Sequence, residues 1–160
     1  MNDLPQKKDL RVWTQLVESH KQYNIDLRDF LSGDVDRVSI MRVALTGKER
    51  NTAIYIARHL SPSELKELFG ELVYLASFAH GAIRSVRDLI LSLPKEWILA
   101  NIGRFVEPIL KEGHEDEYRR ILELYADLDT HLVEDLARRA SKHADEDIRE
   151  AGKDFLQSRI

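Results

Sequence analysis

The chain has no cysteine among its 160 residues, and this absence excludes disulfides and thiolate metal sites. It also lacks a long apolar run, since the longest, at residues 72–79, is far too short to cross a bilayer. Residues 1–13 carry charges on both sides of Pro5 and have no apolar core, so we expect no signal peptide. These absences predict a soluble, cytoplasmic protein with no membrane partner.

The sequence also lacks the short motifs that mark common catalytic and cofactor sites. No GxSxG, Walker or GxGxxG pattern is present, and the six histidines form no HxxxH or HExxH pair. Most histidines fall near expected helix ends, where capping is their ordinary role. We therefore predict no enzyme, no catalytic residue, no metal and no cofactor. A nucleophile assembled from distant residues stays an alternative, and it would require a deep enclosed pocket.

Basic charge is not in surplus. Lys and Arg number 24 against 28 Asp and Glu, which gives a net charge of -4. Residues 1–80 are balanced, with 11 basic and 11 acidic side chains, whereas residues 112–160 carry 8 basic and 14 acidic ones. This balance argues against a nonspecific nucleic-acid binder, which needs positive charge to displace counterions.

Apolar residues recur every three or four positions almost throughout, which predicts an all-α protein in a single domain spanning residues 1–160. The strongest helix start is at Ser61, with Pro62 at the first helical position and Glu64 at the third, which forms a capping box. We also expect Asp34 and Asp145 to cap helices. The pattern predicts ten helices, at residues 5–20, 25–31, 35–45, 48–60, 62–79, 82–93, 94–112, 115–126, 131–142 and 146–157.

Ten helices with short connections predict about five antiparallel hairpins. An arginine near the start of the second helix of the last four hairpins recurs at spacings of 34, 35 and 30 residues, namely Arg50, Arg84, Arg119 and Arg149. Such a period is typical of stacked helical repeats, whose terminal helices act as caps.

The last two units resemble HEAT repeats. In one, Pro108-Ile109-Leu110 is followed by an acidic turn and Tyr118-Arg119; in the other, Leu136-Ala137 is followed by a turn at Asp145 and by Ile148-Arg149. The unit at residues 61–93 matches loosely, and residues 1–60 match only as helical hairpins. The resemblance implies a right-handed α-α superhelix, or solenoid, whose second helices line a concave face that binds other macromolecules. Some HEAT-like relatives are DNA glycosylases and others act on bilin chromophores, but none of their functional residues is matched here.

Four side chains are the best candidates for a binding site on that concave face: Tyr55, Arg58, Arg84 and Arg87. A structural reading is favoured for the arginine series, in which Arg119 pairs with Asp116, and Arg149 with Asp145 or Asp147. Six aromatic residues fall at core spacing and are expected to be buried, whereas Tyr23 and Tyr55 are expected to be partly exposed. The predicted core set is Trp13, Phe69, Tyr74, Trp97, Phe105 and Phe155.

We therefore expect a non-enzymatic scaffold that binds a protein partner. In its concrete form it is a small immunity or antitoxin-type protein, whose acidic patch at Glu115, Asp116 and Glu117 binds a basic toxin or enzyme. The alternative is a nucleic-acid-binding or DNA-glycosylase-like HEAT protein. That alternative requires the arginines at positions 50, 58, 84 and 87 to converge on one positive groove.

Overall fold

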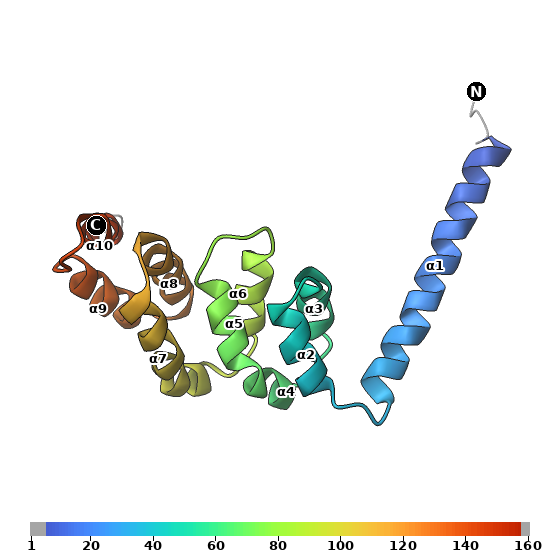
Figure 1. Ribbon diagram of the computed structural model, residues 1–160, viewed down its shortest axis with the longest axis horizontal. Coiled ribbons are helices and arrows are strands. Elements are labelled where there is room, and N and C mark those ends of the chain that lie inside the picture. Colours follow the sequence, from blue (N-terminus) through green and yellow to red (C-terminus); the bar gives the residue numbers. More distant parts are fainter. Residues whose placement is uncertain (1–5, 158–160) are drawn as a thin grey trace.

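The computed structural model describes residues 6–157, which form ten helices and no strand (Figure 1). The helices are α1 (Lys7–Ser32), α2 (Arg37–Thr46), α3 (Arg50–Ala57), α4 (Pro62–Glu67), α5 (Phe69–Ala76), α6 (Ile83–Leu91), α7 (Lys95–Glu112), α8 (Glu115–Leu128), α9 (Thr130–Ala140) and α10 (Glu146–Gln157). The all-α prediction is confirmed for these residues. No helix in this part of the chain combines the length and the apolar character that crossing a bilayer requires.

The N-terminal region is one helix of 26 residues, and the prediction of two shorter helices was wrong. Nothing between Lys7 and Ser32 breaks a helix, because proline and glycine are absent until Gly33. Gln22 donates a hydrogen bond to Asp26 at 2.9 Å, an i,i+4 contact across the predicted break. Pro5, the predicted first helical residue, lies outside the described residues.

The capping box at Ser61 is confirmed. The Ser61 hydroxyl accepts a hydrogen bond from the Glu64 backbone N–H at 3.3 Å, and the Glu64 carboxylate accepts one from the Ser61 N–H at 2.8 Å. The helix that begins there is shorter than predicted, because Leu68 at φ -94° and ψ 6° separates α4 from α5. The cap of α2 is Asp36, which accepts from the Ser39 N–H, so the predicted cap at Asp34 was wrong.

Neighbouring helices pack as four hairpins, formed by α2 with α3, α5 with α6, α7 with α8, and α9 with α10. The first helices of three successive hairpins also contact one another, α2 with α5 and α5 with α7, and α3 contacts α6 as α8 contacts α10. The fifth hairpin does not form, because α1 is a single helix. In Figure 1, α1 leans away from the other helices toward its N-terminal end.

One continuous core runs through the hairpins, from Met41 in α2 to Ile148 in α10. Phe69 is fully buried at its centre, and its ring meets those of Trp97 and Phe105 edge to face at 5.0 and 5.5 Å. Two of the predicted core aromatics are not in it. Trp13 is 62% exposed on α1 and Tyr74 is 55% exposed on α5, so burial was wrong for both.

Candidate functional site

An aromatic and cationic cluster lies on α3 where that helix meets α1. The Tyr55 ring is 52% exposed, with its centroid 6.4 Å from the Tyr23 ring of α1 and 6.3 Å from the His59 ring. The Arg58 guanidinium lies 5.8 Å from the Tyr55 ring centroid. Tyr55 lies in the last turn of α3, and Arg58 and His59 follow in the turn that ends the helix, while Ile54 and Ala57 face the core. The predicted exposure of Tyr55 is confirmed.

Arg58 connects this cluster to the next hairpin. It donates to the Ser85 hydroxyl of α6 at 2.9 Å, and it forms no ion pair with a carboxylate of the described residues. Beside this contact is a depression of about 530 Å³, and Leu60, Leu65 and Asp88 line part of it. The charge of Arg58 is therefore available to a partner, next to an exposed aromatic ring and an apolar hollow.

The remaining two candidates have internal partners. Arg84 is exposed, yet it pairs with Asp88 of its own helix and with Asp127 of α8, each at 3.1 Å. Arg87 is only 8% exposed. It donates to the Glu123 carboxylate of α8, and to the Arg120 carbonyl oxygen at 3.2 Å.

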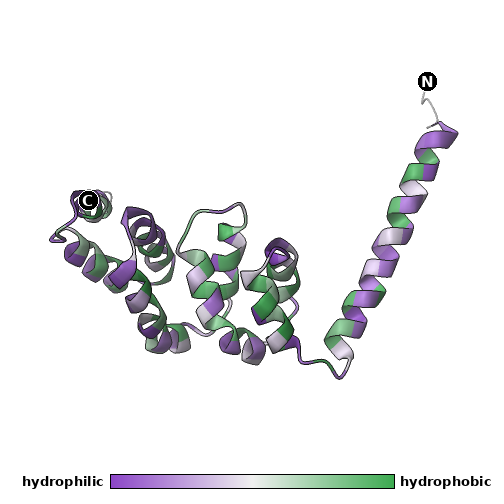
Figure 2. Ribbon diagram, in the orientation of Figure 1, coloured by the Kyte–Doolittle hydropathy of each residue, from purple (hydrophilic) through white to green (hydrophobic). Residues whose placement is uncertain are grey.

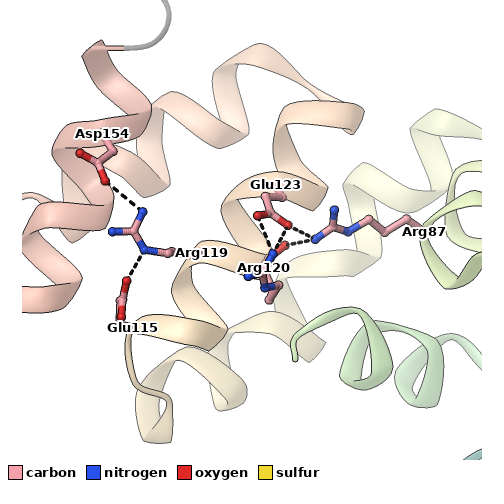
Figure 3. Close-up of polar contacts among 6 residues, drawn as sticks. All are labelled: Arg87, Glu115, Arg119, Arg120, Glu123 and Asp154. Carbon is pink, nitrogen blue, oxygen red and sulfur yellow. Dashed lines mark hydrogen bonds and ion pairs between the residues drawn. The ribbon is translucent and has the colours of Figure 1, made fainter. Parts of the chain in front are cut away.

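Glu123 is the acceptor that joins α6 to α8. Figure 3 shows its carboxylate between the guanidinium groups of Arg87 and Arg120, and Arg120 donates at 2.7 and 2.9 Å. The same figure shows Arg119 reaching both Glu115 on its own helix and Asp154 on α10, the latter at 3.0 Å. The structure therefore groups Tyr55 with Arg58 and assigns Arg87 to the packing between hairpins.

The prediction that Arg119 pairs with a carboxylate is confirmed, but the predicted partner was wrong. Arg119 pairs with Glu115 and Asp154 and not with Asp116. The nearby Glu115 carboxylate raises the pKa of the Arg119 guanidinium. Arg149 donates instead to the backbone carbonyl oxygens of residues 143 and 144, at 2.9 and 2.7 Å. Arg50 lies over the ring of Phe78, with 5.6 Å from the guanidinium carbon to the ring centroid.

The predicted acidic patch is partly occupied by local contacts. Glu115 pairs with Arg119, and Glu117 accepts a hydrogen bond from the His114 N–H at 2.8 Å, at the start of α8. Asp116 is exposed and contacts no basic side chain of the described residues. Glu115 is therefore balanced by a cation, whereas Asp116 and Glu117 keep negative charge that no described basic side chain offsets.

Two histidines, His80 and His143, contact backbone N–H groups near helix starts. A ring nitrogen of His80 lies 3.2 Å from the Ala82 backbone nitrogen, and one of His143 lies 3.0 Å from that of Asp145. Within residues 6–157, no three histidine, aspartate or glutamate side chains gather as metal ligands would.

A hollow between α5 and α7 was not predicted. It has a volume of about 710 Å³ and is lined by Tyr74, Phe105 and Pro108, among others. Gly70 allows this packing, because a Cβ there would lie 2.9 Å from the Phe105 ring. A glycine inside the apolar run of residues 65–76 was the sequence feature that could have indicated a close approach of two helices.

No protein-family model matches this chain, and no curated protein and no solved structure matches it either. Function must therefore be inferred from the residues and their contacts.

Proposed function

We propose that this protein is a non-enzymatic binding module, a short HEAT-like solenoid of helical hairpins that holds a protein partner against α3 and α6. The observation that carries the proposal is the exposed Tyr55 ring beside Arg58, which forms no ion pair with any carboxylate of residues 6–157. Tyrosine and arginine are the side chains that most often anchor protein interfaces, because each combines a large flat surface with polar groups.

A protein partner fits these contacts better than a nucleic acid does. The nucleic-acid alternative needs several arginines to direct uncompensated charge into one groove. Here Arg84 is balanced by Asp88 and Asp127, and Arg87 is buried against Glu123. Of the four arginines, Arg50 and Arg58 have no carboxylate partner among the described residues, but Arg50 lies over the Phe78 ring, and two phosphate contacts give little affinity.

The immunity or antitoxin form of this proposal adds a basic toxin or enzyme as the partner. Its support is the acidic surplus of residues 112–160 together with the uncompensated carboxylate of Asp116. Opposite charges increase the association rate and make binding weaken with salt.

The experiment is an affinity capture from the source lysate, treated with nuclease, that compares wild-type bait with Tyr55→Ala. Tyr74→Ala is the matched control, because Tyr74 has the same side chain and nearly the same exposure but lies on α5. We expect wild type and Tyr74→Ala to retain one protein in stoichiometric amount, and Tyr55→Ala to lose it. Capture of nucleic acid alone, or equal retention by all three baits, would refute the proposal.

The electrostatic part has its own test. With the retained protein in hand, Asp116→Lys should weaken binding several-fold at low salt and much less at high salt. If the affinity changed neither with salt nor in Asp116→Lys, a basic partner would be excluded, while the proposed Tyr55 contact would stand.

A further inference from the structure

The N-terminal half of α1 presents an apolar side that no described residue covers. Leu10, Trp13 and Leu16 are 49%, 62% and 59% exposed, and their three-residue steps place them on one side of the helix, next to Val17. The opposite side is polar and holds Arg11, Gln15, Glu18 and Gln22. Figure 2 shows the corresponding alternation of hydrophobic and hydrophilic residues along α1.

The C-terminal half of the same helix does pack. Phe30 and Leu31 are partly buried against the core, and the Tyr23 ring meets Tyr55. Residues 7–20 extend beyond these contacts for roughly 20 Å at the rise of an α-helix. One continuous helix thus has a few partly buried side chains toward its C-terminal end and none of these contacts along its N-terminal half.

The residue spacing on α1 suits another helix as the cover. Steps of three and four residues run without a break along the series Leu10, Trp13, Val17, His20, Asn24, Leu27 and Leu31. This is the heptad pattern of helices that pack at a shallow angle. The polar pair in its middle ends the uncovered apolar block, since Asn24 and His20 lie 3.3 Å apart and contact each other.

A lipid surface suits α1 less well. Helices that bind the plane of a membrane carry a basic surplus on their polar side. Residues 7–32 carry five basic and four acidic side chains, so the surplus is a single charge.

We propose that α1 pairs with α1 of a second copy of this chain, antiparallel, about a two-fold axis near Trp13. Three residues of the block read the same in both directions, because Leu10 precedes Trp13 by three residues and Leu16 follows it by three, whereas Val17 falls opposite Asp9. An antiparallel pair therefore sets Trp13 on Trp13 and Leu10 against Leu16, the self-complementary contact that two-fold symmetry requires. It also keeps the two sets of hairpins apart, because each set packs at the C-terminal end of its own α1.

The available area predicts a weak dimer. The exposed apolar side chains supply roughly 300–400 Å² from each copy, and the stems of flanking polar side chains bring the total buried area to about 1,000 Å². That is the low end for specific interfaces. We expect dissociation constants in roughly the micromolar range and a monomer–dimer equilibrium that is visible on dilution.

The first test is sedimentation of the full chain over a wide concentration range. We expect wild type to shift from monomer to dimer, and Trp13→Ala/Leu16→Ser to stay monomeric. Gln15→Ala/Gln22→Ser changes the polar side of the same helix and should dimerise as wild type does. All three should keep the same far-ultraviolet circular dichroism, and the same urea midpoint at concentrations where each is monomeric, because the changed side chains are exposed.

The second test uses the absence of native cysteine, which makes any disulfide diagnostic. Trp13→Cys should cross-link between copies on mild oxidation, as should the double variant Leu10→Cys/Leu16→Cys. Leu10→Cys alone and Gln15→Cys should not. Efficient cross-linking of Leu10→Cys alone would show a parallel pair and overturn the proposed geometry.

A chain that stays monomeric at every concentration would overturn the dimer itself. Co-sedimentation of that monomer with phosphatidylcholine and phosphatidylserine vesicles, lost in Trp13→Ala/Leu16→Ser, would assign the apolar side to a lipid surface instead. Neither result would bear on the Tyr55 contact, because that proposal rests on α3 and α6, whereas the dimer proposal rests on the N-terminal half of α1.

Discussion

Arg37 and Glu64 form an ion pair that joins the ends of three helices. The Arg37 Nε donates to one Glu64 oxygen at 2.6 Å, while the other oxygen closes the capping box at Ser61. The same guanidinium donates to the carbonyl oxygens of Leu31 and Gly33, at 3.0 and 3.4 Å, where α1 ends. The end of α1, the start of α2 and the start of α4 are therefore held by a single arginine.

Arg37→Met should loosen α1 as well as lower stability. We expect the free energy of unfolding to fall by about 1–2 kcal/mol, because charge-assisted hydrogen bonds to a half-buried carboxylate are lost. Limited proteolysis should then cut near residues 31–36 several-fold faster than in wild type. Urea denaturation and digestion followed by mass spectrometry measure the two effects.

Arg42 provides the control for that experiment. It lies on α2 and pairs with Glu71 of α5 at 2.6 Å, but its side chain is nearly half exposed. Arg42→Met should cost less than about 1 kcal/mol and leave the cleavage rate near residues 31–36 unchanged. Equal acceleration of cleavage in both variants would contradict the anchoring role of Arg37.

Arg87 and Arg84 should differ sharply in their contribution to stability, although they are one turn apart. Arg87→Met leaves Glu123 with Arg120 as its remaining cation, so we expect a loss of about 2–3 kcal/mol rather than the larger cost of an isolated buried charge. Arg84→Met removes exposed pairs and should cost at most about 0.5–1 kcal/mol. Urea midpoints of the two variants decide this, and equal costs would refute the packing role of Arg87.

Local signals predicted the caps at Ser61 and Asp145 correctly, but they placed the cap of α2 at Asp34 instead of Asp36. Ser61 and Glu64 are three residues apart, and Asp145 accepts from the N–H groups of Asp147 and Ile148 at 2.9 and 3.3 Å. Such caps involve neighbours in sequence, so the residue types themselves indicate the contact. The prediction failed at Leu68, where a helix breaks without glycine or proline.

The spacing of apolar residues along a helix did not predict which element packs on its apolar side. Trp13 and Phe69 both lie on apolar sides of helices, yet one is exposed and the other is at the centre of the core. Periodicity identifies a side and not the element that packs on it.

The same limit applies to the candidate site. Arg87 and Glu123 are 36 residues apart, so their pairing depends on how α6 and α8 stack. Tyr55 was recognisable as exposed because its neighbours Ile54 and Ala57 account for the buried side of α3.

Two helical glycines, Gly152 in α10 and Gly103 in α7, should respond in opposite directions to alanine. A Cβ at Gly152 would lie 2.5 Å from the Ser141 backbone nitrogen and 2.7 Å from the Ala137 carbonyl oxygen, so α10 must move off α9. We expect Gly152→Ala to cost about 2–3 kcal/mol. Gly103 lies inside α7 with nothing within 4 Å of a Cβ, and Gly103→Ala should stabilise by about 0.5–1 kcal/mol.

Thermal unfolding of these two variants measures both signs at once. If Gly152→Ala proved neutral, α9 and α10 would have to be further apart than the structure places them. Gly103→Ala is the control, because it shows that an alanine inside a helix does not by itself lower the stability of the protein.

Stability should fall in acid in part through Asp129. Lys95 pairs with this carboxylate at 3.1 Å, and the N–H groups of His131 and Leu132 donate to it. The Lys95 contact first, and these backbone groups next, lower the pKa of Asp129 below its ordinary value of 3.8. A carboxyl group whose pKa is lower in the folded state contributes stability above its unfolded pKa, and this contribution disappears as the pH falls through the folded value.

Asp129→Asn removes that charge while keeping a side chain that can cap α9. Its free energy of unfolding should lie below that of wild type at pH 7, and the two should converge as the pH falls from 5 toward 2. Asp116→Asn, which removes an exposed carboxylate with no described partner, should follow wild type throughout. Urea denaturation at each pH measures the three curves. If the difference in free energy of unfolding between wild type and Asp129→Asn stayed constant with pH, the shape of the capping side chain, and not its charge, would account for the stability that Asp129 contributes.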